Sequence, residues 1–299
     1  MHMTTVPLVI TFPLSPILYQ LGPIAIRWYG LGYAVAFMVG LAMVANHLKR
    51  YRLTERDWGD LAFWAIVVGL IAARLYYVVQ SGFGWYLTHP QHILAFWEGG
   101  MAYFGAVWSV PFLVIAYCFW KKLATWVVLD AAALFAAVGQ PIGRIGNIFN
   151  GDILGYQSSL PWAFRYTSPD TFAPQIGVSY QPAALYELLV GLCILGILLL
   201  VRARLRPRPG GLFVGYLGMY AASQFGMFFL RANSITLFGL KQAQLSAIVL
   251  GLIALALWAF WYRTAVRRDR ARLSEDGAAA AATARDEAQE DAKPAVESS

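Results

Sequence analysis

Residues 28–48 read WYGLGYAVAFMVGLAMVANHL, a predominantly apolar run that ends in Lys49, Arg50 and Arg52. A helix needs roughly 20 such residues to cross the hydrocarbon core of a bilayer, so this run is long enough to span a membrane. Six further apolar runs follow it along the chain: 58–79, 101–120, 124–142, 182–201, 211–230 and 242–262. The sequence therefore predicts an all-α polytopic membrane protein of about seven transmembrane helices.

The overall composition agrees with a lipid environment. The 299 residues are 59% hydrophobic and only 13% charged, whereas soluble domains carry about 25% charged residues. The net charge of +7 raises the question of nucleic-acid binding, but most basic residues directly follow apolar runs. That placement is typical of topology signals, so we expect membrane lipid and no nucleic acid as a partner.

The basic residues also predict the orientation of the chain. Alternate connections carry fifteen of them: Lys49, Arg50, Arg52, Arg56, Lys121, Lys122, Arg202, Arg204, Arg206, Arg208, Arg263, Arg267, Arg268, Arg270 and Arg272. The opposite connections carry five: Arg27, Arg144, Arg165, Arg231 and Lys241. Because cytoplasmic loops are enriched in Lys and Arg, the C-terminal tail is predicted inside and, with seven helices, the N-terminus outside.

This frame divides the chain into three parts. Residues 1–27 are predicted to be an extracytoplasmic N-terminal segment, and residues 28–262 a seven-helix transmembrane domain. Residues 263–299 begin with basic residues and continue with Ala, Glu and Asp and almost no large apolar side chains. A tail of that composition is expected to be disordered, here in the cytoplasm.

One segment concentrates polar chemistry at the end of an apolar run. Residues 143–155 read GRIGNIFNGDILG and include Arg144, Asn147, Asn150 and Asp152. Glycines permit non-helical backbone and close approach to a ligand, while amide groups and a guanidinium can bind a phosphate. We expect a phosphate or lipid-headgroup site at the outer bilayer face, with a tight structural turn as the alternative.

Four other charged residues lie in or beside apolar runs: Arg74, Asp130, Glu187 and Arg231. Ionisable groups are costly in a membrane, so each is a functional candidate. The alternatives are structural: a helix-bonding arginine, a cap at Asp130, a carboxylate partner for an arginine and an interfacial anchor. The two cysteines lie inside apolar runs without zinc-ligand spacing, and we expect no metal site.

Several ordered motifs resemble one family, the bacterial phosphatidylglycerol–prolipoprotein diacylglyceryl transferases. The segment GRIGNIFNGD at 143–152 is similar to the family signature G-R-x-G-N-F-x-N-x-E. Further similarity covers most of residues 12–262, with matching motifs ARLYY at 73–77, WEGGM at 97–101 and QPAALYE at 181–187. The resemblance implies a multi-pass protein of the bacterial cytoplasmic membrane with its site near the extracytoplasmic face.

The resemblance also implies a reaction. Such enzymes transfer the diacylglyceryl group of phosphatidylglycerol to the thiol of the lipobox cysteine in a prolipoprotein, the first step of lipoprotein maturation. A thioether forms and glycerol 1-phosphate leaves. The implied partners are phosphatidylglycerol and lipobox-containing prolipoproteins, and no cofactor is implied. Cations and amide donors suit the leaving phosphate, and the thiol needs a base or an electropositive setting.

Residue by residue, the resemblance assigns candidate roles. Tyr29, Arg144 and Asp152 correspond to catalytic positions. The substrate-binding positions are Arg74, Arg144, Asn147, Asn150, Gly155, Tyr186, Glu187 and Arg231. Asp152 stands where the family carries Glu, which keeps the charge but shortens the side chain by one methylene.

Three family positions lack their reactive group. Phe104 occupies the place of a His, Gln224 that of a second essential Arg, and Phe228 that of a Glu. An active enzyme would then need another base, for which His92 and Asp152 are candidates. The alternative is a catalytically degenerate paralogue that binds phosphatidylglycerol or lipoprotein precursors without turnover.

Overall fold

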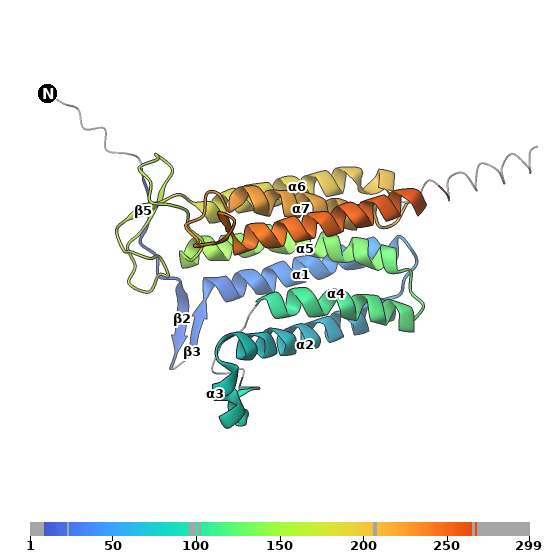
Figure 1. The fold of residues 1–299 in the computed structure, drawn as a ribbon, viewed down its shortest axis with the longest axis horizontal. Coiled ribbons are helices and arrows are strands. Elements are labelled where there is room, and N and C mark those ends of the chain that lie inside the picture. The colour runs from blue at the N-terminus through green and yellow to red at the C-terminus, as the bar shows by residue number, and fades with distance from the viewer. Residues whose placement is uncertain are drawn as a thin grey trace, which may run out of the picture.

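Helices dominate the fold and lie side by side along its long axis (Figure 1). The computed structural model describes residues 9–22, 24–95, 100, 103–205, 208–264 and 267. The helices are α1 (Trp28–Lys49), α2 (Glu55–Gln80), α3 (Phe83–Thr88), the 3-10 turn η1 (Pro90–His92), α4 (Tyr103–Trp120), α5 (Thr125–Asn150), α6 (Ala183–Leu205), α7 (Gly211–Met227) and the C-terminal helix Gln242–Thr264. The predicted tail beyond residue 267 lies outside the described residues.

Five helices are long and apolar enough to cross a membrane, which fits a membrane protein. They are α1, Trp58–Val79 within α2, α5, α6 and the C-terminal helix. The two remaining predicted runs also lie in helices, α4 with 18 residues and α7 with 17. Large apolar side chains point outward from the bundle, among them Phe119, Trp120 and Leu200, exposed to 73%, 72% and 79%. Lipid is the environment that makes such exposure favourable.

Helix α5 is the centre of the bundle. Leu134 and Ala137 pack with Leu198 of α6 and Leu212 of α7 in one buried cluster. Other residues of α5 complete clusters with α2 and α4 and with the end of α1. Because α5 contacts helices on all these sides, its direction decides where the polar residues near its C-terminus lie.

The signature segment is helical up to Asn150, which corrects the expectation of released backbone from residue 143. Gly146 serves close helix packing instead of a turn: a Cβ there would lie 3.0 Å from Cα of Tyr29, and a Cβ at Gly32 of α1 would lie 3.9 Å from Cα of Gly146. Small residues allow membrane helices to approach closely, here α1 and α5. The helix ends at Gly151, whose left-handed φ of 75° and N–H bond to the Asn147 carbonyl form the cap.

Short strands add to the helices at one end, so the all-α expectation was incomplete. They are β1 (Ile10–Phe12), β2 (Ile17–Leu21), β3 (Ile24–Arg27), β4 (Phe164–Tyr166), β5 (Ser179–Tyr180), β6 (Ile235–Leu237) and β7 (Leu240–Lys241). A three-stranded sheet has the order β1–β4–β5, with β1 and β4 parallel. Two hairpins, β2–β3 and β6–β7, complete the set. The sheet thus ties the N-terminal segment to the long connection between α5 and α6.

At the other end, Asp130 caps α7 from across the bundle. Its Oδ2 accepts a hydrogen bond from the N–H of Gly210 at 2.7 Å, and its Oδ1 accepts one from the N–H of Phe213 at 2.8 Å. The first N–H groups of a helix have no partner within the helix, and a carboxylate satisfies them. This is the structural alternative, a cap, that the sequence left open for Asp130.

Candidate active site

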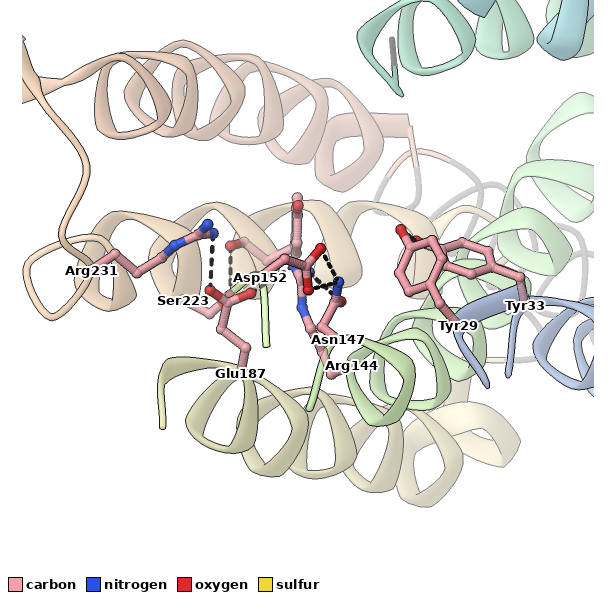
Figure 2. Close-up of polar contacts among 9 residues, drawn as sticks. Tyr29, Tyr33, Arg144, Asn147, Asp152, Glu187, Ser223 and Arg231 are labelled. Carbon is pink, nitrogen blue, oxygen red and sulfur yellow. Dashed lines mark hydrogen bonds and ion pairs between the residues drawn. The ribbon is translucent and has the colours of Figure 1, made fainter. Parts of the chain in front are cut away.

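A buried carboxylate joins two arginines at the end of the bundle that carries the sheet. Nη2 of Arg144 in α5 lies 2.6 Å from Oε2 of Glu187 in α6, and Nη1 of Arg231 lies 3.3 Å from Oε1. Glu187 is 6% exposed. A buried charge is costly unless paired, and here each oxygen of the carboxylate faces a different guanidinium (Figure 2).

Arg144 also organises the polar side chains on its other side. Its Nη1 donates to Oδ1 of Asn147 at 3.3 Å, and Nδ2 of Asn147 donates to both oxygens of Asp152 at 3.0 and 3.2 Å. The amide therefore connects the cation to a second carboxylate, as Figure 2 shows. Asp152 is exposed, whereas Glu187 is buried. The two carboxylates thus have different access to a ligand or to solvent.

The Arg231 guanidinium is held by two groups, the Phe228 ring and the Glu187 carboxylate. The guanidinium carbon lies over the ring of Phe228, 4.5 Å from the ring centroid. Burial lowers the pKa of the Arg231 guanidinium, and the attraction of Glu187 opposes that shift. Nε of Arg231 is buried with no hydrogen-bond partner in the part of the chain that the structure describes. An aromatic face and a carboxylate therefore fix the cation while at least one donor remains unused.

Lys241 supports the backbone that carries Arg231, a role that sequence reasoning missed. Its Nζ donates to the carbonyls of Phe228 and Arg231 and to the hydroxyl of Tyr156. Lys241 is 5% exposed. The last carbonyls of a helix need partners, and a cation is favourable there. The sequence signal was a single charge at the end of the uncharged stretch 232–240, which separates Lys241 from Arg231.

Gly155 contributes backbone geometry to this end of the cluster. It forms an isolated antiparallel bridge with Arg231, and its N–H donates to the Gln181 carbonyl at 2.9 Å. A Cβ at Gly155 would lie 2.5 Å from the carbonyl oxygen of Leu230, closer than any side chain tolerates. The residue must be glycine because Leu230 on one side and Gln181 on the other leave no room for a side chain.

A tyrosine pair lines the other side of the cluster. The Tyr29 hydroxyl donates to that of Tyr33 at 2.9 Å, and the ring centroids are 4.6 Å apart. Both come from the first turns of α1, where Tyr29 lies beside Gly146 of α5 and Tyr33 beside Gly143. In the view of Figure 2 the pair lies beyond Asn147 as seen from Glu187. Tyr33, four residues after Tyr29, is a second residue that sequence reasoning missed.

Two predicted residues anchor the loop after α5 instead of joining the arginines. The Asn150 carbonyl accepts hydrogen bonds from the N–H of Phe172 at 3.0 Å and from the Thr171 hydroxyl at 3.2 Å. The Tyr186 hydroxyl accepts one from Nε1 of Trp162 at 2.7 Å. Both contacts fasten the connection between α5 and α6 to the ends of these two helices.

Arg74 lies apart from the Arg144–Glu187–Arg231 cluster. Its guanidinium donates to the carbonyls of His92, Ile93 and Gly100 at 2.7, 3.0 and 3.1 Å, and the residue is 1% exposed. This arginine fastens the connection between α2 and α4 to the bundle. His92, the candidate substitute base, packs its ring 5.2 Å from that of Trp85 in the same connection.

The family positions without a reactive group have different settings. Phe228 is buried under the Arg231 guanidinium, so an aromatic face stands where the family pattern has a carboxylate. Gln224 is half-buried in α7. The side chain of Phe104, and most of the WEGGM motif, lie outside the described residues.

Comparisons with known proteins converge on one group. The family model for prolipoprotein diacylglyceryl transferase matches residues 16–261. A phosphatidylglycerol–prolipoprotein diacylglyceryl transferase of Nostoc sp. is 34% identical over 255 residues, covering 81% of this chain and 88% of the relative. Those of Lactiplantibacillus plantarum and Bacillus licheniformis are each 35% identical, covering 82% and 83% of this chain and 89% and 93% of theirs.

Proposed function

The chain belongs to the prolipoprotein diacylglyceryl transferase family, and we propose that it transfers the diacylglyceryl group of phosphatidylglycerol to a prolipoprotein cysteine. The observation that carries the proposal is the ion pair of Arg144 with Glu187, which presents an ordered guanidinium beside Asn147 and Asp152. The family assignment and its relatives favour transfer over the non-catalytic alternative.

The reaction balances with a thiol as nucleophile. The sulfur of the lipobox cysteine attacks the glycerol carbon that carries the phosphate ester, and a carbon–sulfur bond forms. The carbon–oxygen bond to phosphate breaks, and its electron pair leaves with glycerol phosphate. The thiol proton passes to a base and finally to the released phosphate or to solvent. Charge therefore develops on the thiolate and on the leaving phosphate, and both need nearby cations or donors.

The two arginines divide that work. Arg144 and Arg231 each pair with Glu187 through one guanidinium nitrogen. A guanidinium has further N–H groups that can bind phosphate oxygens. Glu187 keeps the two cations together and prevents their mutual repulsion from opening the site. Tyr29 adds a hydroxyl at the α1 side. Asn147 orients Asp152, the exposed carboxylate and our candidate for the proton acceptor.

The remaining predicted residues have positioning roles in this proposal. Gly155 and Asn150 hold the backbone that follows α5, and Tyr186 holds the connection between α5 and α6. Arg74 fastens the loop between α2 and α4. Each acts by shaping the lipid and precursor site instead of touching the reacting atoms.

The proposal includes a topology. Seven helices would span the bacterial cytoplasmic membrane, with the N-terminus and the polar cluster on the outer side. In support, the strands and the polar cluster share one end of the bundle, and the basic ends of α1 and α6 face the other (Figure 1). Exported precursor and outer-leaflet lipid would meet at that cluster. Reporter fusions after residues 50, 122 and 264 should all report the cytoplasm.

A direct assay tests the activity. The purified protein is incubated with phosphatidylglycerol and a lipobox peptide, and the mass of the peptide is followed. The expected product carries one diacylglyceryl thioether, and a Cys→Ser peptide gives none. Failure to form the thioether at high enzyme load, with folded protein and bound lipid, would replace this proposal by the non-catalytic alternative.

A further inference from the structure

A second buried polar cluster lies at the end of the bundle away from the strands. His47 belongs to the last turn of α1 and Arg202 to the last turn of α6. They are 2% and 7% exposed. Nε of Arg202 donates to Nδ1 of His47 at 3.3 Å. His47 is 18 residues beyond Tyr29 on one helix, so the two clusters are about 27 Å apart.

The hydrogen bond between these residues fixes which groups remain unused. Because Nδ1 of His47 accepts, the proton of the neutral ring is on Nε2. Nε2 of His47 and Nη2 of Arg202 are both buried, and neither has a hydrogen-bond partner among the described residues. Buried polar groups are normally satisfied, so two unused donors in one cluster indicate a missing acceptor.

The charges of the cluster make that acceptor an anion. Within the described part of the chain, no carboxylate is paired with Arg202. Arg50 is close enough to Arg202 for the two charges to repel each other. The nearby Lys49–Glu55 pair is exposed at both ends and adds little. A buried cation without a counter-ion is strongly unfavourable.

We propose that the ends of α1 and α6 form a binding site for a phosphate-ester anion, with Arg202 as its principal cation. A guanidinium binds phosphate through paired N–H groups, and His47 holds Arg202 in place by accepting from Nε. The anion has two sources, the headgroup phosphate of an anionic lipid in the adjacent leaflet or free phosphate. The site is separate from the proposed transfer chemistry at Arg144.

Thermal unfolding in neutral detergent tests the proposal on the full-length chain. All proteins carry Arg144→Gln, so that lipid binding at the Arg144–Glu187–Arg231 cluster contributes less to the shift of the unfolding midpoint. The ligands are dihexanoyl phosphatidylglycerol, dihexanoyl phosphatidylcholine and inorganic phosphate. We expect phosphatidylglycerol to raise the unfolding midpoint more than phosphatidylcholine does, and Arg202→Gln to weaken its apparent affinity about 10-fold.

The matched control is Arg204→Gln, which removes the same charge from an exposed position two residues away on α6. It should retain the affinity. If Arg202→Gln does not fold, Arg202→Lys replaces it and should weaken binding several-fold, because lysine lacks the planar fork, whereas Arg204→Lys should not.

A response to phosphatidylglycerol alone supports a lipid headgroup as the source, and an equal response to inorganic phosphate supports free phosphate. The proposal is overturned if neither ligand raises the midpoint above the phosphatidylcholine value. It is equally overturned if the substitutions at Arg202 and Arg204 weaken binding to the same extent.

Discussion

Nη2 of Arg144 lies 2.6 Å from Oε2 of Glu187, and this contact joins α5 to α6 at the polar end of the bundle. The same carboxylate also pairs with Arg231 through its other oxygen. Two cations that would repel each other are therefore held by one buried negative charge. The geometry allows both to face a phosphate without separating.

Replacing Glu187 by Gln should remove the charge that holds the two guanidiniums together. The amide keeps the shape but loses the charge, so two guanidiniums would share a buried site without a counter-ion. We expect transfer to fall about 100-fold and the free energy of unfolding to fall by about 3 kcal/mol. The measurements are kcat/KM with a lipobox peptide and the thermal midpoint. Unchanged transfer would remove Glu187 from the proposed machinery.

Any substitution of Arg144, including a conservative one, should lower the transfer activity. It contacts Asn147 through Nη1 and Glu187 through Nη2, and lysine offers a single point charge. Arg144→Ala should lower kcat/KM by about 10³-fold and Arg144→Lys by about 10²-fold. Complementation of a transferase-depleted strain provides the cellular readout. Rescue by Arg144→Ala would contradict the role assigned to this residue.

Lys241→Met should impair transfer indirectly. The substitution preserves length but removes the donor to the carbonyls of Phe228 and Arg231, leaving buried acceptors unsatisfied at about 2 kcal/mol of stability. Because the Arg231 backbone would then shift, we expect kcat to fall more than KM rises. Ser246→Ala, an exposed position on the C-terminal helix, is the control and should behave as wild type.

Gly155→Ala should be far more damaging than its size suggests. The new methyl group would lie 2.5 Å from the Leu230 carbonyl oxygen, so the bridge to Arg231 must separate. Gly139→Ala in α5 is the matched control, because a Cβ there meets nothing within 4 Å. We expect the first variant to lose most transfer and the second to retain it. Equal activities would show that the bridge is dispensable.

Asp130→Ala should affect stability without touching the polar cluster. It removes the acceptors for the N–H groups of Gly210 and Phe213 at the start of α7, a loss of about 1–2 kcal/mol. The thermal midpoint should drop, while KM for phosphatidylglycerol stays constant in the folded fraction. A changed KM would indicate that α7 transmits the defect to Arg231.

The helices and the identity of the family followed from the sequence, because both depend on local or ordered patterns. The long apolar runs need no tertiary information: a helix is the only local structure that satisfies its backbone within such a run. The motif GRIGNIFNGD likewise gave Arg144, Asn147 and Asp152 from residue type and spacing.

What those residues do to one another was decided by tertiary packing. The glycines of the motif predicted a turn, yet Gly143 and Gly146 lie in a helix, where Gly146 packs against Tyr29 of α1, and only Gly151 ends it. The pairing of Arg144 with Glu187, and the support of Arg231 by Lys241, join residues separated by long stretches of chain. Periodicity reports which face of a helix is apolar, but contacts between distant segments depend on how those helices cross.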